Sequence, residues 1–219
     1  MSDDVKEVKQ KELNGILFWV LIALIIVVPL VYFVFRNHND KVNIVSSEKF
    51  ETVFENLKEF DELNDVSKVE EKDNLLKELD GIIVNYPKTV SAKRALFYKG
   101  YVSYFAKDYE NAIVYLNQFL AQNGKDYLAP KANYFLAFSM IEQEKNDDAM
   151  KFFDVIINQL NDKYYAPLAL IKKAELLEDK GNKDEALKCY QKIIDDFSLS
   201  PQKEIAQLKK VMLENEVSF

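Results

Sequence analysis

Two pairs of adjacent carboxylates, one cysteine and one histidine are the residues here whose types could do acid–base or nucleophilic chemistry. Asp147–Asp148 and Asp195–Asp196 could act as general acid and base. Cys189 could act as a nucleophile if a histidine activated it, but His38 is the one histidine in the chain. Adjacent carboxylates are more typical of solvated helix ends, and a lone cysteine is more typical of a buried spacer. We therefore predict that the protein is not an enzyme.

Composition narrows the classes of ligand. The net charge is −7, and the only arginines are Arg36 and Arg94, so the chain lacks the dense basic face that phosphate backbones require. One cysteine cannot form an internal disulfide, and one histidine cannot supply a multi-imidazole metal site. The sequence also has no Gly-rich phosphate loop. These features predict no cofactor, no metal and no nucleic acid.

An apolar stretch near the N-terminus predicts a membrane anchor. Twenty residues from Ile16 to Phe35 carry no charge, and a helix of that length spans the roughly 30 Å hydrocarbon core of a bilayer. The alternative is a cleaved signal peptide. Its apolar region would be shorter and would end in small residues, whereas the sequence after Tyr32 offers no such cleavage site.

The charges beside the apolar stretch bear on its orientation. Three lysines, at positions 6, 9 and 11, and the terminal amine precede it, and Arg36, Lys41 and Lys49 follow it. The positive-inside rule therefore leans only slightly towards a cytoplasmic N-terminus. We predict a short tail over residues 1–14, a transmembrane helix over 15–35, a polar linker over 36–47 and a helical domain over 48–219.

A 37-residue repeat organises the rest of the chain. Apolar residues fall at helical spacing almost to the end, and several positions recur at this interval. The recurring sets are Gly100, Ala137 and Ala174; Ala112, Ala149 and Ala186; Leu116, Phe153 and Tyr190; and Phe119, Ile156 and Ile193. The small residues predict close approach of two antiparallel helices in each unit. The sequence therefore predicts an all-α stack of helix hairpins.

The segments between these helices carry turn and cap signals. Asp108, Asn146 and Asn182 are predicted N-caps, with Glu185 completing a capping box after Asn182, and Gly181 suits a helix end. The near-identical "YLAP" and "YYAP" segments place Pro130 and Pro167 in the first turn of a helix, where a missing N–H costs little. We expect the tyrosines that open these segments, Tyr127 and Tyr164, to pack under the incoming chain.

The repeats resemble the tetratricopeptide repeat (TPR) family. "GYVSYFAKDYENAIVYLNQFL" and "AELLEDKGNKDEALKCYQKII" carry its pattern of small, turn, alanine, aromatic and aliphatic residues. The resemblance implies an α-solenoid with three clear repeats and one divergent repeat. Leu75, Leu79 and Ile82 occupy the equivalent places of the divergent unit, with Pro87 as its stop and Leu63 where a small residue is expected. Residues 201–215 are expected to form a terminal capping helix.

The resemblance also implies a binding groove lined by the first helix of each unit. Its predicted residues are Arg94, Phe97, Tyr101 and Tyr104, then Lys131, Tyr134, Phe138 and Ile141, then Leu168, Ile171, Glu175 and Glu178. Aromatic side chains are good anchors for a protein partner because they bury a large area at low entropic cost. The alternative is that several of these rings pack between helices of the same chain.

The order of tail, span and repeats resembles bacterial envelope TPR proteins, and in particular the ancillary subunit family of the Sec translocon. That resemblance implies a single-pass inner-membrane protein whose C-terminal domain lies in the periplasm. It also implies protein partners, such as the translocon, a periplasmic chaperone or another envelope protein, for a scaffold or chaperone-like module. The alternative is an adaptor whose repeats face the cytosol and recruit a soluble partner to the membrane.

Overall fold

The computed structural model describes residues 2–160 and 162–215, and these form an all-α fold. Met1, Asn161 and residues 216–219 of the predicted domain lie outside the described residues. The helices are α1 (Ser2–Glu62), α2 (Asp65–Asn85), α3 (Val90–Phe105), α4 (Tyr109–Asn123), α5 (Ala129–Ile141), α6 (Asn146–Asp154), α7 (Tyr165–Asp179), α8 (Lys183–Asp196) and α9 (Gln202–Glu214), with a π-helical segment, η1 (Val155–Leu160), extending α6.

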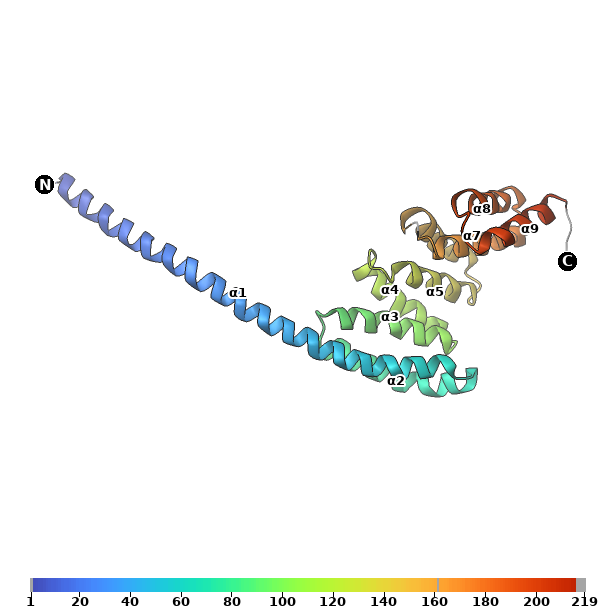
Figure 1. The fold of residues 1–219 in the computed structure, drawn as a ribbon, viewed down its shortest axis with the longest axis horizontal. Coiled ribbons are helices and arrows are strands. Elements are labelled where there is room, and N and C mark those ends of the chain that lie inside the picture. The colour runs from blue at the N-terminus through green and yellow to red at the C-terminus, as the bar shows by residue number, and fades with distance from the viewer. Residues whose placement is uncertain (1, 161, 216–219) are drawn as a thin grey trace.

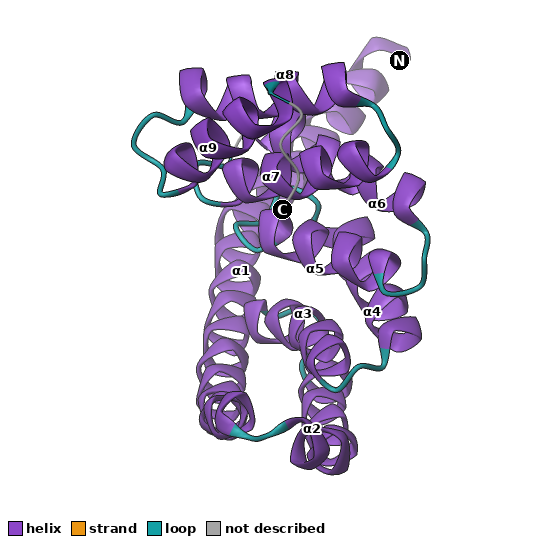
Figure 2. Cartoon of the chain, turned by 90° about the vertical axis from the view of Figure 1, so that its right-hand side faces the viewer, coloured by secondary structure: helices purple, strands orange, loops and turns teal. Residues whose placement is uncertain are grey.

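Successive helices pair and stack into a solenoid, the helical array. Pairs built from α1/α2, α3/α4, α5/α6 and α7/α8 rise in order from the end of α1, and α9 closes the stack (Figures 1 and 2). The predicted helical architecture is therefore confirmed. Because each pair contacts mainly its neighbours, the core is a continuous seam between layers instead of one central cluster.

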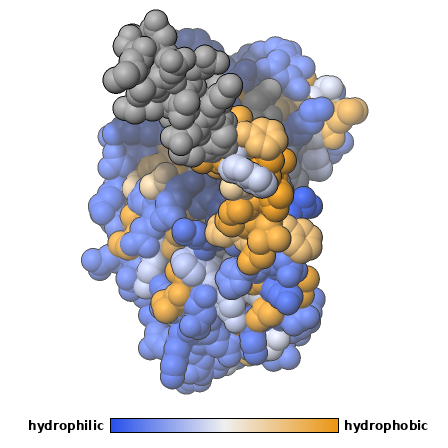
Figure 3. Space-filling model, turned by 90° about the vertical axis from the view of Figure 1, so that its left-hand side faces the viewer, coloured by the Kyte–Doolittle hydropathy of each residue, from blue (hydrophilic) through white to orange (hydrophobic). Residues whose placement is uncertain are grey.

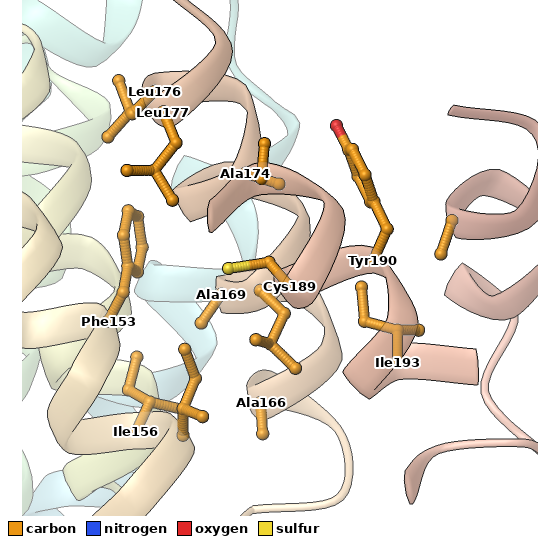
Figure 4. Packing of buried hydrophobic residues seen from close by; sticks show 14 of the residues in the cluster. Phe153, Ile156, Ala166, Ala169, Ala174, Leu176, Leu177, Cys189, Tyr190 and Ile193 are labelled. Atoms are coloured by element: carbon orange, nitrogen blue, oxygen red, sulfur yellow. The ribbon is translucent and has the colours of Figure 1, made fainter. Parts of the chain in front are cut away.

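The four recurring columns form that seam. Every member is buried: the alanines Ala112, Ala149 and Ala186 are fully inaccessible, and so are the large residues at the two columns that follow. In the α7/α8 layer, Ala174 faces the helix that carries Cys189 and Tyr190, while Phe153 and Ile156 reach the layer from the preceding unit (Figure 4). Matching burial at matching positions confirms that the 37-residue period is structural.

The turn inside each unit repeats its backbone conformation as well as its spacing. Lys107, Glu144 and Gly181 are 37 residues apart, and all three are left-handed, with φ of 62°, 59° and 74°. The N–H that follows each of them donates to a carbonyl five residues back, from Asp108 to Ser103 and likewise in the next two units. Glycine adopts the left-handed conformation most readily, and only one of the three turns has glycine at this position. Gly181 is therefore confirmed as a helix-end residue.

We expect Glu144→Gly to stabilise the array by about 0.5–1 kcal/mol. A left-handed residue with a Cβ is strained by about 1–2 kcal/mol, and glycine removes this strain. The greater chain entropy of glycine in the unfolded state offsets part of that gain. Gly181→Ala should lose about 1 kcal/mol at the equivalent turn. Urea unfolding of the two variants measures both changes. Equal effects of the two substitutions would contradict this explanation.

The N-cap residues agree with the sequence at two of the three predicted positions, and a side-chain cap bond forms at one of them. The Asp108 carboxylate accepts the backbone N–H of Asn111 at 3.3 Å and caps α4. The prediction for Asn146 is wrong, since Asn146 is the first residue of α6 and Lys145 precedes it as N-cap. Asn182 is the N-cap residue of α8 but makes no side-chain cap bond, so the predicted capping box does not form. Its other member, Glu185, pairs with Lys188 instead.

Asp108 joins two layers, because its carboxylate also accepts a hydrogen bond from the Lys72 ammonium of α2 at 2.7 Å. Burial alone would raise the pKa of Asp108, but the bonds from Lys72 and Asn111 outweigh it and lower that pKa below its usual value. We expect Asp108→Ala to destabilise the array by about 1–2 kcal/mol at neutral pH. Because the folded-state pKa is lowered, the difference from the wild type should begin to shrink as the pH falls below about 4 and should be lost only at lower pH, where the carboxylate of the folded protein gains its proton. Unfolding curves at a series of pH values from 7 downwards test this.

The first unit departs from the others in length. α2 begins 44 residues before α4, whereas its buried Leu75, Leu79 and Ile82 precede their equivalents by 37. The seven additional residues are two helical turns, so α2 extends beyond α4 at its N-terminal end. Leu63, aligned with Gly100 by the 37-residue spacing, accordingly lies after the end of α1 instead of within it. α2 ends at Asn85, just before Pro87, as predicted.

The segment predicted as a polar linker is helical. α1 runs without a break from the apolar stretch through residues 36–47 into the first unit. No glycine or proline interrupts residues 36–62, and packing against the array begins at Ser46 and Phe50, which are both fully buried. At 1.5 Å per residue, the twelve residues of this segment hold the array about 18 Å from Phe35.

The tyrosines of the repeated "YLAP" and "YYAP" segments do not pack under the incoming chain. Tyr127 and Tyr164 are 72% and 69% exposed. Pro130 and Pro167 do lie in the first turns of α5 and α7, where they are buried. The segments therefore mark the start of a helix through proline, while the tyrosines are free of the core.

The terminal helix forms as predicted but covers the array with one face only. α9 packs on α8 and α7 through Ala206, which is fully buried. Its outer face carries Ile205, Leu208 and Val211, which are all exposed.

Candidate functional site

The predicted groove residues share one face of the first helices of successive units. α3, α5 and α7 lie side by side in the stack, and each predicted position recurs 37 residues later on the next helix (Figure 1). Regular spacing therefore aligns the predicted positions of the three helices in rows that run across the array, each row holding one residue from each unit. The rows differ in how far neighbouring side chains cover them, and this difference decides which residues a partner could contact.

At the start of the groove, Arg94 is engaged within the chain. Its guanidinium stacks 4.2 Å from the ring centre of Phe50 and lies 3.7 Å from a carboxylate oxygen of Glu51. Both of these residues belong to α1. Arg94 thus ties α3 to α1 instead of forming a free cationic rim.

Phe97 and Tyr101 form the floor under the groove. Phe97 is fully buried and Tyr101 is 9% exposed, so for these two residues the structure favours packing between helices over an open lining. The Tyr101 hydroxyl donates to Asp61 at 2.9 Å. Burial, followed by this bond to a carboxylate, raises the pKa of Tyr101, so its phenol stays protonated. A substitution at Tyr101 would therefore disturb the core as well as the surface.

The remaining predicted residues of α3 and α5 are half-buried and form a continuous aromatic surface. Tyr104 packs 5.0 Å from Phe135 between ring centres, and Tyr134 packs 4.7 Å from Phe138. Burial raises the pKa of Tyr104 to about 12. On α5, Lys131 lies at the N-terminal end of this surface and Ile141 lies at its C-terminal end. These residues remain candidates for contact with a partner.

The two glutamates that the sequence predicted at the acidic end of the groove have different partners. Glu175 pairs with Lys172 at 3.0 Å, whereas Glu178 accepts a hydrogen bond from the buried Tyr190 hydroxyl. Leu168 and Ile171 are half-buried. The chain therefore offsets the charge of Glu175, while Glu178 keeps its negative charge at this end of the groove.

Sequence reasoning missed a neighbouring row of groove residues. Tyr98, Phe135 and Lys172 are again 37 residues apart, each one position after a predicted residue. Phe135 contacts Tyr101 and Phe105 at 5.4 and 5.5 Å, and Lys172 stacks over Phe138. The period itself carried this signal, because any aromatic at a repeated position next to a groove residue belongs to the same surface.

The residues considered for catalysis lie apart from this surface. Asp147 pairs with Lys180, Asp148 with Lys151 at 2.7 Å, and Asp196 with Lys192 at 2.7 Å. Cys189 is buried, and burial raises the pKa of its thiol. Across residues 2–160 and 162–215, no group of three or more histidine, cysteine, aspartate or glutamate side chains is placed to hold a metal ion.

The apolar stretch of α1 lies wholly outside the core. One helix among the described residues is long and apolar enough to cross a membrane, and this part of it is not buried at all. In the view towards that end of the molecule, hydrophobic residues gather along α1 while the surrounding surface is mainly hydrophilic (Figure 3).

Paired helices at a fixed period, small residues at the crossings and an aromatic face on the first helices define a TPR-type helical repeat protein. A family model described as a tetratricopeptide repeat-like domain matches residues 12–215, and the chain belongs to this family. Comparison with curated proteins finds no match. The family fold is typical of non-enzymatic scaffolds that bind other proteins.

Proposed function

We propose that the chain is a single-pass membrane-anchored interaction module whose TPR array faces the periplasm. The observation that carries this proposal is the exposed apolar stretch of α1, which continues as one helix into the first unit of a protein-binding fold. A bilayer is the environment in which a long run of uncovered apolar residues, here 17–35, is stable. The anchor would raise the effective concentration of the array beside a membrane complex.

The likeness of the layout to the ancillary subunit of the Sec translocon supports a role beside a secretion or envelope-assembly complex. In that role the module would act as a scaffold or as a chaperone-like partner for proteins that cross or enter the membrane. Three lysines and the terminal amine before the span, against Arg36, Lys41 and Lys49 after it, support a cytoplasmic N-terminus and hence a periplasmic array.

Protease accessibility tests the orientation. We expect the array to resist protease in intact cells and to be digested once the outer membrane is opened osmotically, with a cytosolic marker remaining intact. Protection until the inner membrane is lysed would overturn the periplasmic proposal and support the second candidate, a cytosol-facing adaptor. The mass of the membrane-bound chain provides an independent check, because a cleaved signal peptide would remove the apolar stretch.

A paired substitution tests the groove. We expect Tyr134→Ser with Phe138→Ser to reduce the amount of any crosslinked partner at least about tenfold, since buried aromatic anchors are commonly worth 2 kcal/mol or more. Val114→Ser, on the exposed outer face of α4, is the matched control and should leave crosslinking unchanged. A folded double variant that crosslinks as well as the wild type would contradict the groove.

A further inference from the structure

The cations on the groove face differ in whether the chain neutralises them. Arg94 lies near Glu51, and Lys172 pairs with Glu175. Lys131, on the first turn of α5, makes no hydrogen bond or ion pair with any described residue. Its ammonium instead lies over aromatic rings, 5.0 Å from the centre of Tyr101 and 5.7 Å from that of Phe97.

This environment is costly for an unpaired cation. Lys131 is half-buried, and burial lowers the pKa of its ammonium, with Asp61 opposing the shift. Asp61 does not form an ion pair with Lys131, and one of its oxygens already accepts the Tyr101 hydroxyl. Contacts with ring faces recover part of the lost hydration, but they leave the three N–H donors without an acceptor among the described residues.

A carboxylate would complete this site. Cations held on aromatic faces with little water bind oxygen anions through charge-assisted hydrogen bonds, which are stronger than neutral ones. The rings around Lys131 come from two successive units and offer apolar contacts to the residues beside such a carboxylate. The other cations among the predicted and neighbouring groove residues, Arg94 and Lys172, lie beside carboxylates of the chain, so Lys131 is the groove cation that is open to a carboxylate from a partner.

We propose that Lys131 binds an aspartate or glutamate side chain of a partner protein and so determines which charge the groove selects. The bound carboxylate would lie on an extended segment, flanked by apolar residues. This inference rests on the proposed function, because it specifies the partner of the same surface. The aromatic floor of Phe97 and Tyr101 holds the ammonium in place, and the half-buried rings of α5 receive the flanking side chains.

A random library of nine-residue peptides displayed on phage provides a defined probe. We expect selection against the full chain in nanodiscs of zwitterionic lipid to enrich peptides with one acidic position between apolar or aromatic residues. Synthetic copies of those peptides should bind Lys131→Met about ten to one hundred times more weakly, the loss typical of one charge-assisted bond. Lys131→Arg should stay within a few fold of the wild type.

Lys93→Met is the matched control, because Lys93 is an exposed lysine on α3 outside the groove rows, and it should leave binding unchanged. Methionine keeps an apolar stem of similar length at position 131, so the melting temperature of Lys131→Met should stay near that of the wild type. Binders without an acidic position, or acidic binders that keep their affinity for Lys131→Met, would overturn the carboxylate site alone. A wild-type selection that yields no binders would overturn the groove itself and this site with it.

Discussion

Three lysines in the apolar stretch, at Leu24, Ile25 and Val28, should prevent membrane association of the full chain. A lysine near the middle of a membrane helix costs about 2.5–3.5 kcal/mol, so three should cost roughly 7–10 kcal/mol and reverse insertion. The array should keep its thermal stability, because the stretch contributes nothing to its core. Fractionation of cells followed by an alkaline carbonate wash measures the change.

The matched control places three lysines on the helical segment after the span, at Asn37, Asn39 and Asn43. These positions are exposed and lie outside the hydrocarbon core, so this variant should stay in the membrane. If the variant with lysines in the apolar stretch resists the alkaline wash as well as the control does, then membrane insertion does not depend on this stretch. If the wash releases the wild type too, then the array holds the protein at the membrane only by peripheral contacts.

Gly100→Ala should destabilise the array by about 1–3 kcal/mol, the usual cost of overpacking, even though alanine favours helices. A Cβ at Gly100 would lie 2.5 Å from Leu116 Cγ and 3.2 Å from the Leu116 backbone nitrogen. Leu116 is fully buried at the centre of the α3/α4 crossing and has little room to move. The equivalent positions, Ala137 and Ala174, face rings instead of a branched leucine.

Gly81→Ala is the opposite case and serves as the control. A Cβ there meets no atom within 4 Å, so the alanine should stabilise α2 by about 0.5–1 kcal/mol. Urea unfolding of the two variants should give changes of opposite sign. Stabilisation of both would show that the α3/α4 crossing relaxes freely and that its close approach is unimportant.

The uninterrupted α1 has a consequence for the way the array meets a partner. If the apolar stretch spans a membrane, as we propose, a flexible linker would let the domain turn freely above the bilayer, whereas one helix would fix both its height and its direction. The groove of α3, α5 and α7 therefore faces a set direction relative to the anchor. For a module beside a membrane complex, such a fixed orientation reduces the entropy lost on binding.

The amino-acid sequence by itself determined the repeat, the helix pairs and the candidate span. Period and residue size were sufficient for this, because Ala112, Ala149 and Ala186 can recur at one interval only if the same close crossing recurs. The left-handed turns were visible from sequence only at Gly181, since Lys107 and Glu144 adopt the same conformation against their local preference. The continuity of α1 was missed because a polar composition was taken as a linker, and helices tolerate polar residues on every exposed face.

Only the tertiary structure decided which groove residues remain accessible. Spacing shows that Phe97, Tyr101 and Lys131 share a face of the first helices, but burial depends on side chains that arrive from other helices. Rings of α3, α4 and α5 pack on Phe97 and Tyr101. Carboxylates from α1 and α7 pair with Arg94 and Lys172, which leaves Lys131 without an ion pair among the described residues. The exposure of Tyr127 and Tyr164 was decided in the same way, because it too depends on which side chains of other elements reach them.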